Sequence, residues 1–171
     1  MPVVALRDSE EIEDWRVRQM VDVCGLYFGE LWSRGNLAVA DDICDAAFVH
    51  TDSIWNPSRL VAGPSAMKAF VRDTRAAYPD LVVRAVEYGT SDADRLFVHW
   101  TGSMTNLGRF HGHSATRQNT KVTGVSMMSF TKDRSKLVEV NVFRQPTREE
   151  KTEFADREGG FELHLARLHF G

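Results

Sequence analysis

The chain has 171 residues, of which 43% are hydrophobic and 26% are charged, and its formal net charge is −3. These values are typical of one soluble, compact domain, and the lack of a stripe rich in arginine and aromatic residues argues against a nucleic-acid-binding protein. No apolar run is long enough to span a membrane, and two cysteines, Cys24 and Cys44, are too few for a disulfide framework or a zinc site.

The N-terminal segment Met1–Leu6 is too short for the apolar core of a signal peptide, and acidic residues follow it directly. We therefore expect a cytoplasmic protein, although an organelle stays open if a transit peptide has been removed.

Two helices are expected before the first strand. Apolar residues recur at three- and four-residue steps from Glu10 to Arg34, with Ser9 as a plausible N-cap and Gly35 as a plausible C-cap. A shorter helix is expected over Asn36–Ala46, and a short strand over Ala47–His50 follows it.

The rest of the domain reads as one helix and four strands. Gly63 and Pro64 begin the helix, and Pro79 ends it. Four strands with short polar turns are expected at Leu81–Tyr88, Arg95–Ser103, Thr120–Thr131 and Lys136–Arg144. Helices followed by an antiparallel meander predict an α+β fold.

The chain changes character after Pro146. We assign residues 1–146 to the domain and residues 147–171 to a C-terminal extension. Thr147–Arg157 reads as a charged helix, and Phe161–Phe170 is an apolar tail. Since exposed apolar patches of this size are rare, we expect the tail to pack on the domain or on a dimer partner.

Two continuous motifs resemble those of SnoaL-like polyketide cyclases, also called ester cyclases. The first motif matches at Trp100, Thr101, Thr105, Gly108, Phe110, Gly112, Ala115 and Thr116, and departs at Met104, Asn106 and Arg117. The second matches at Gly63, Pro64, Phe70, Arg75, Ala77, Pro79, Asp80 and Leu81. The resemblance covers about Leu26 to Gln145. It implies the cone-shaped fold of nuclear transport factor 2 and its relatives, in which a curved antiparallel sheet wraps around N-terminal helices and encloses a pocket.

His50 is the first candidate for chemistry, because it follows a strand and occupies the position of a histidine in the family. A neutral imidazole beside a pocket can move protons near neutral pH, but it can equally cap a loop. Asp52 either orients His50 or forms an Asx turn. Three aromatic residues, Tyr27, Trp32 and Trp55, either line a ligand cavity or only pack.

The resemblance implies a catalytic aspartate at the end of the last strand, but this chain has Gln145 there. Asn141 replaces a family tryptophan on the same strand, and the strand before it carries no histidine. An amide is not basic near neutral pH, so the family's acid/base mechanism does not transfer, and His50 becomes the candidate base. We expect Asn106, Asn141 and Gln145 to hold ligand oxygens.

Two further residues are candidates for ligand binding. His99 faces either a cavity or a dimer interface, and Phe143 lies on the last strand. A metal site is not expected. His111 and His113 have the spacing of a pair of metal ligands, but no third ligand is visible in the sequence. We therefore expect neither a metal nor a cofactor.

These observations leave three functions open. The first is a cyclase, isomerase or hydratase that uses acid/base chemistry on an apolar, carbonyl-containing, polyketide-like substrate. The second is a non-catalytic module that binds a small apolar or aromatic ligand, and the third is a protein-interaction domain. Apolar residues on both faces of Phe97–Thr101 and Val138–Phe143 further predict a homodimer through the outer face of the sheet.

Overall fold

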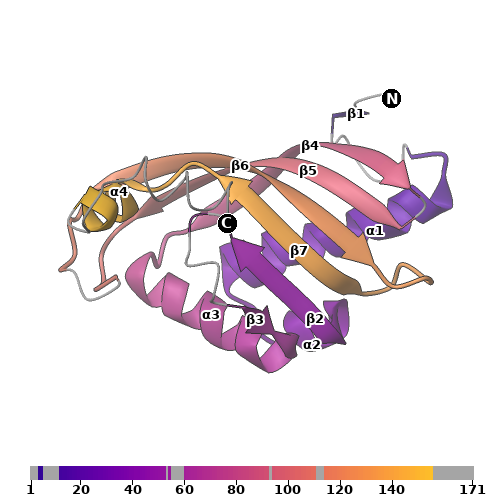
Figure 1. Cartoon of the computed structure of the whole chain (residues 1–171), viewed down its shortest axis with the longest axis horizontal. Coiled ribbons are helices and arrows are strands. Elements are labelled where there is room, and N and C mark those ends of the chain that lie inside the picture. Colours follow the sequence, from indigo (N-terminus) through magenta and orange to yellow (C-terminus); the bar gives the residue numbers. More distant parts are fainter. Residues whose placement is uncertain are drawn as a thin grey trace.

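The computed structural model describes residues 4–5, 12–52, 54, 60–92, 94–110 and 114–155 (Figure 1). The elements in chain order are β1 (Val4–Ala5), α1 (Trp15–Gly25), η2 (Leu26–Arg34), α2 (Val39–Ile43), β2 (Cys44–Asp52), β3 (Val61–Ala62), α3 (Gly63–Ala77), β4 (Val82–Asp92), β5 (Arg95–Thr105), β6 (Asn119–Phe130), β7 (Leu137–Arg144) and α4 (Arg148–Ala155). Here η2 is a π-helix.

The first helix is not the single α-helix that its periodicity predicts. It begins at Trp15, where the Asp14 carboxylate accepts a hydrogen bond from the Arg16 N–H at 2.9 Å. From Leu26 onward it continues as the wider η2. The Ser33 hydroxyl donates to the carbonyl of Phe28, five residues earlier, at 2.7 Å. The end is as predicted, at Gly35 with φ of 71° in the left-handed region.

The Ser33 hydroxyl also joins η2 to the sheet. Its oxygen lies 3.0 Å from the Val83 carbonyl oxygen and accepts the Val83 N–H at 2.8 Å. These contacts fix the wide turn against β4.

The second helix ends earlier in the chain than predicted, at Ile43 and not at Ala46, and the first strand after it, β2, begins correspondingly earlier. The helix α2 is only five residues long, and Cys44 already has extended backbone with φ −100° and ψ 133°. Cys44 pairs with Leu137 of β7, so strand pairing extends β2 into residues whose apolar spacing fits a helix. The third helix agrees with its prediction, because α3 begins at Gly63 with proline in its first turn and ends before Pro79.

The sheet has the strand order β1-β4-β5-β6-β7-β2-β3. Strands β4 to β7 form the expected antiparallel meander. The prediction of a fully antiparallel sheet is wrong for one pair of strands. β2 pairs with β7 in parallel, with His50 opposite Val140. A long connection through α3 and the meander returns the chain to β2 in this direction. The sheet is therefore mixed, and the α+β class is confirmed.

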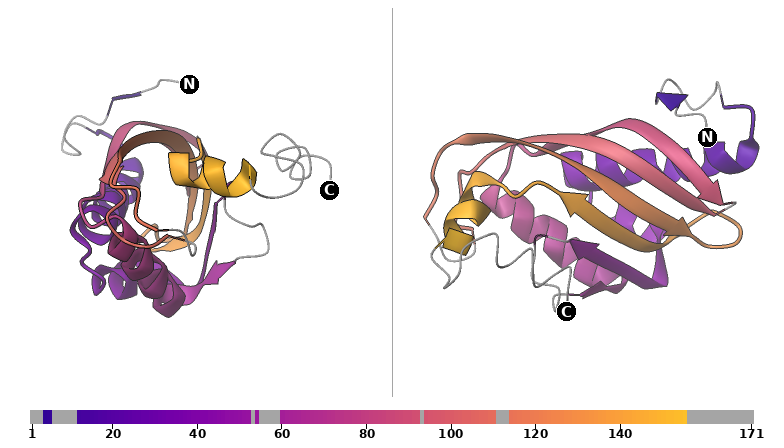
Figure 2. Two further views of the ribbon diagram at one scale, coloured as in Figure 1. Left: turned by 90° about the vertical axis from the view of Figure 1, so that its left-hand side faces the viewer. Right: turned by 45° about the horizontal axis from the view of Figure 1, so that its top comes forward.

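The sheet curves around the helices, as the end-on view in Figure 2 shows. Residues on β5 alternate strictly, so Leu96, Val98 and Trp100 are buried beneath the helices while Phe97 and His99 lie on the outer face. The short helix α4 lies across one end of this arrangement (Figure 2).

The C-terminal extension is described as far as Ala155. The charged helix expected there is present as α4, whereas the apolar tail Phe161–Phe170 lies outside the described residues. Among the described helices, none has the length and apolar character needed to cross a bilayer.

Candidate functional site

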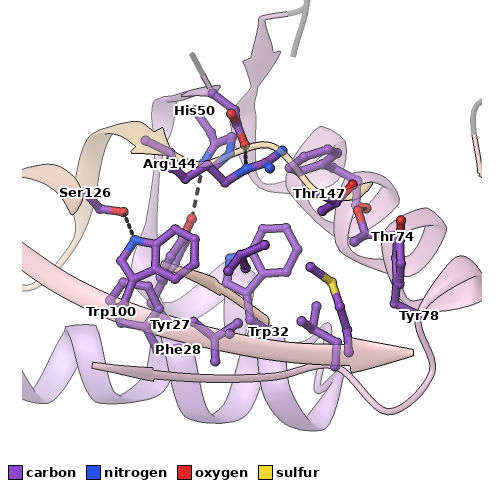
Figure 3. Close-up of a pocket in the computed structure, with 18 of the residues that line it drawn as sticks. Tyr27, Phe28, Trp32, His50, Thr74, Tyr78, Trp100, Ser126, Arg144 and Thr147 are labelled. Carbon is purple, nitrogen blue, oxygen red and sulfur yellow. Dashed lines mark hydrogen bonds and ion pairs between the residues drawn. The ribbon is translucent and has the colours of Figure 1, made fainter. Parts of the chain in front are cut away.

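A cavity of about 100 Å³, here called the inner chamber, lies between the helices and the inner face of the sheet (Figure 3). Its wall is mainly apolar, and it includes four residues predicted for the site: Tyr27, Trp32, His50 and Asp52. The other wall residues come from η2, from α3 and the segment after it, from strands β4 to β7, from the segment after β5 and from the start of α4.

Strand alternation places His50 and Asp52 in this wall together. Phe48, His50 and Asp52 are two residues apart on β2, so their side chains share one side of the strand. Phe48 fills the core with no exposed surface, and His50 is only 3% exposed. Because Phe48 is buried in the core, His50 and Asp52 on the same side of β2 also face inward, towards the chamber.

The imidazole of His50 is held by Tyr27. Its Nδ1 lies 3.1 Å from the Tyr27 hydroxyl oxygen, and the rings of Trp32 and Phe70 stand 6.3 Å and 5.3 Å away. Burial, together with the positive charge of Arg144, lowers the pKa of His50 to about 3. His50 is therefore a neutral imidazole near pH 7 and a weak base.

The surroundings of Tyr27 favour one tautomer of His50. Burial raises the pKa of the Tyr27 hydroxyl, and the Trp32 indole N–H, which can only donate, opposes this rise. Nδ1 of His50 is then the acceptor left for the buried hydroxyl hydrogen within the described chain. We infer that Nδ1 accepts and that Nε2 carries the proton. No partner for Nε2 is found among the described residues.

The Asp52 carboxylate does not orient His50. One oxygen accepts the Ile54 N–H at 2.9 Å, which is the Asx turn considered from the sequence. The other accepts Nε–H of Arg144 at 2.7 Å. Burial raises the pKa of Asp52, and the Arg144 charge opposes this only in part.

Arg144 has a second carboxylate partner in α4. Its Nη1 and Nη2 donate to the two oxygens of Glu150 at 2.8 Å and 2.6 Å. The Glu150 carboxylate also accepts the Thr147 N–H at 2.6 Å, and the Thr147 hydroxyl accepts the Glu150 N–H at 3.2 Å. This is a capping box. The Arg144 charge holds the pKa of Glu150 below its usual value despite burial.

Sequence reasoning missed both Arg144 and Glu150. The Thr-x-x-Glu pattern at residues 147–150 was a visible signal for the capping box. Arg144 was missed because the family resemblance points to Gln145, which is exposed, is not among the residues lining the chamber, and donates its backbone N–H to Thr123 at 3.2 Å. On β7, Val140, Val142 and Arg144 face inward, so the neighbouring position cannot.

Three other predicted ligand contacts lie on the outer face of the sheet. Asn141 accepts a hydrogen bond from the Thr51 hydroxyl, and Phe143 is 53% exposed. His99 lies 3.1 Å from Glu87 and 3.0 Å from the Thr123 hydroxyl. These residues are not brought together with His50.

Asn106 is buried, yet it does not line the chamber. Its side chain accepts the Thr116 N–H at 2.7 Å and donates to the Gly108 carbonyl at 3.0 Å. It therefore closes a loop. Trp100 does line the chamber and donates its indole N–H to the Ser126 hydroxyl at 3.0 Å (Figure 3).

Trp55, His111 and His113 lie outside the described residues. Among the residues that are described, no three histidine, cysteine or acidic side chains are grouped as a metal site would require.

Residues 23–143 match the family model described as SnoaL-like polyketide cyclase. Among solved structures, the chain resembles a candidate SnoaL-like polyketide cyclase from Jannaschia sp. CCS1, with 20% identity, a TM-score of 0.65, and 74% and 85% of the two chains covered.

Two Streptomyces proteins are also similar. AclR, a candidate hydroxylase from Streptomyces galilaeus, has 21% identity, a TM-score of 0.60 and coverage of 74% and 89%. IdmH, a candidate polyketide cyclase from Streptomyces antibioticus, has 17% identity, a TM-score of 0.61 and coverage of 74% and 92%. A search of curated proteins gave no match.

Proposed function

The chain belongs to the SnoaL-like polyketide cyclase family, and we propose that it catalyses proton transfer next to a carbonyl group of a small substrate bound in the inner chamber. The outcome would be an isomerisation or a ring closure. The observation that carries this proposal is the meeting of His50 and Asp52 in an otherwise mainly apolar wall.

In this proposal His50 holds the carbonyl oxygen. Its Nε2–H is a hydrogen-bond donor fixed in place by Tyr27, and its low pKa keeps the ring neutral. A fixed donor stabilises the negative charge that develops on the oxygen when a proton leaves the adjacent carbon. This replaces the sequence-based view of His50 as the base.

Asp52 is the proposed base. A carboxylate with a raised pKa is a stronger proton acceptor than an ordinary aspartate. It removes a proton from the carbon beside the carbonyl, and the electron pair of that C–H bond forms the enolate. Asp52 then returns the proton to another carbon of the same molecule. Alternatively, the enolate carbon attacks a second carbonyl and closes a ring, and the resulting alkoxide oxygen takes the proton from Asp52. No co-reactant is needed in either case.

Hydrogen exchange tests this proposal without requiring the identity of the natural substrate. A panel of small apolar ketones and keto esters would be incubated with the protein in deuterium oxide, and deuterium uptake beside the carbonyl followed by NMR. Asp52→Asn should slow the uptake by about 10²–10⁴-fold, the usual contribution of an acid/base group.

Asp41→Asn is the matched control, because Asp41 is an exposed partner of Lys68 outside the chamber. It should exchange at the wild-type rate. Uptake that Asp52→Asn leaves undiminished would contradict the assignment of the base.

A non-catalytic binding module is the second candidate. It is favoured by the pairing of Arg144 with two carboxylates and by the low pKa of His50, which together leave few groups that change charge near pH 7. Saturable binding of panel members without deuterium uptake would support this function instead.

A further inference from the structure

A second hollow, the outer chamber, adjoins the inner chamber and has a volume of about 360 Å³. The two chambers share the wall residues His50, Asp52, Phe70, Thr74 and Phe110. The residues proposed for chemistry therefore stand between two compartments of different size.

The inner chamber sets an upper limit on what it can hold. A cavity of about 150 Å³ in another protein accommodates a benzene molecule, and this chamber has about 100 Å³. A group of roughly one small ring fits, whereas a substrate with several fused rings does not. The outer chamber falls in the lower part of the range of about 300–1,000 Å³ that is usual for ligand pockets.

The walls of the two chambers differ in chemistry. The inner chamber is closed mainly by aromatic and aliphatic side chains from η2 and the meander, among them Phe28, Val83 and Val122. Its charged residues Asp52, Arg144 and Glu150 are paired with one another. The outer chamber adds the charged residues Asp73 and Arg109 to an apolar floor that includes Val61. Apolar groups thus match the inner wall, and polar groups with hydrogen-bonding capacity match the outer one.

We propose that the substrate is an amphipathic carbonyl compound that occupies both chambers. Its small apolar end, no larger than one ring, fills the inner chamber, and its polar remainder lies in the outer chamber. The carbonyl group then lies at the shared wall beside His50 and Asp52. This inference rests on the proposed function for the role of the carbonyl, but its size and polarity limits come from the chambers alone.

A series of three probes tests these limits. They are cyclopentanone, the same ring carrying a neutral hydroxyethyl-acetamide arm, and a three-ring anthracenone. Affinity would be measured by NMR titration of the Trp32 and Trp100 indole N–H groups, both in the inner wall. The armed ring should bind at least about tenfold more tightly than cyclopentanone, equivalent to about 1.4 kcal/mol, and the anthracenone should not bind.

Variants assign each part of the probe to a chamber. Ala66 lines only the outer chamber, so Ala66→Trp should remove the gain from the arm and leave cyclopentanone binding unchanged. Val83 lines only the inner chamber, so Val83→Phe should weaken both probes. Ser65→Trp is the matched control, because Ser65 is exposed on α3 and lines neither chamber. Melting curves would confirm that each variant folds.

The results separate this inference from the proposed function. Binding that follows the expected pattern without deuterium uptake would support two chambers and overturn the catalytic proposal. Uptake with no gain from the arm, or with tighter binding of the anthracenone, would overturn the two-chamber inference and leave catalysis standing.

Discussion

Glu150 of α4 accepts two hydrogen bonds from the Arg144 guanidinium of β7, at 2.8 Å and 2.6 Å. Because the same carboxylate accepts the Thr147 N–H, one side chain both begins α4 and fixes it to the last strand. The side chains of Arg144 and Glu150 are only 9% and 3% exposed. Thr147 and Glu150, at the start of the C-terminal extension, are thus part of the chamber wall.

Glu150→Ala should therefore lower the free energy of unfolding strongly. The change leaves Arg144 buried with one carboxylate partner in place of two and removes the capping box. Breaking a buried pair of this kind costs about 3–5 kcal/mol. We expect about 3 kcal/mol by urea denaturation, because Asp52 still pairs with Arg144.

The control is Glu30→Ala, which removes the exposed pair between Glu30 and Arg34. A pair at this helical spacing contributes only about 0.3–0.5 kcal/mol. Equal losses in the two variants would show that the buried Arg144–Glu150 pair stabilises the fold no more than the exposed Glu30–Arg34 pair does.

The lowered pKa of His50 predicts that the free energy of unfolding decreases as the pH is lowered. Between pH 6.5 and about 3 the unfolded chain binds a proton at His50 that the folded chain does not. Stability therefore rises with pH across this window, by about 1.4 kcal/mol per unit. Asp52, with a raised pKa, has the opposite sign.

The His50 contribution is isolated by comparison with His50→Gln, which cannot titrate. Urea unfolding at pH 6 and pH 5 should show a steeper loss in the wild type by about 1.2 kcal/mol, because the unfolded histidine is only partly protonated at pH 6. Parallel losses in the two proteins would mean that the folded protein binds a proton at His50 as readily as the unfolded chain does.

Tyr27→Phe should change the tautomer of His50. In the wild type, NMR of the imidazole nitrogens should show a protonated Nε2 and an unprotonated Nδ1, because we infer that the Tyr27 hydroxyl, 3.1 Å from Nδ1, is the donor. The variant loses this donor, so the tautomers should mix, and unfolding should become easier by about 1 kcal/mol. Tyr88→Phe, on β4 and outside the chamber wall, should leave the His50 signals unchanged. A wild type protonated at Nδ1 would reverse the proposed role of His50.

Gly108→Ala should destabilise the loop that follows β5. A Cβ atom at residue 108 would lie 2.2 Å from the backbone oxygen of Ala76, so the backbone would have to move. The Gly108 N–H also donates to Ala77 at 3.0 Å, at the end of α3. We expect a loss of about 1–3 kcal/mol. Gly89→Ala is the control, because a Cβ there meets nothing within 4 Å, and a similar loss in both would contradict the argument.

The sequence was most informative where single residues punctuate the chain. Gly63, Pro64 and Pro79 delimit α3 correctly, and alternating residues locate the meander strands, although β4 continues to Asp92, beyond its predicted end at Tyr88. Such signals act locally, so they do not depend on the rest of the fold. The two glycine-containing motifs identified the family for the same reason.

Local sequence patterns did not predict those side-chain positions that depend on tertiary contacts. Tyr27 and Trp32 are five residues apart, which in an α-helix separates them by about 140° around the axis. In the wider η2 they both reach the chamber, with ring centroids 6.3 Å apart. Ser33 of η2 accepts a hydrogen bond from Val83 of β4, a contact between segments that only folding brings together. Likewise, the resemblance pointed to Gln145, but the alternation of side chains along β7 places the neighbouring Arg144 in the chamber wall.

The homodimer expected through the outer face of the sheet stays a prediction. Val125 and Phe143 are direct neighbours on β6 and β7 and are 40% and 53% exposed. A stable interface buries about 800 Å² on each partner, so a charge at the centre of this apolar pair would oppose it. Phe143→Lys should therefore shift a dimer towards monomer in sedimentation velocity runs. Leu107→Lys, equally exposed at 53% but in a loop, should remain dimeric. A wild type that sediments as a monomer at high concentration would exclude the dimer.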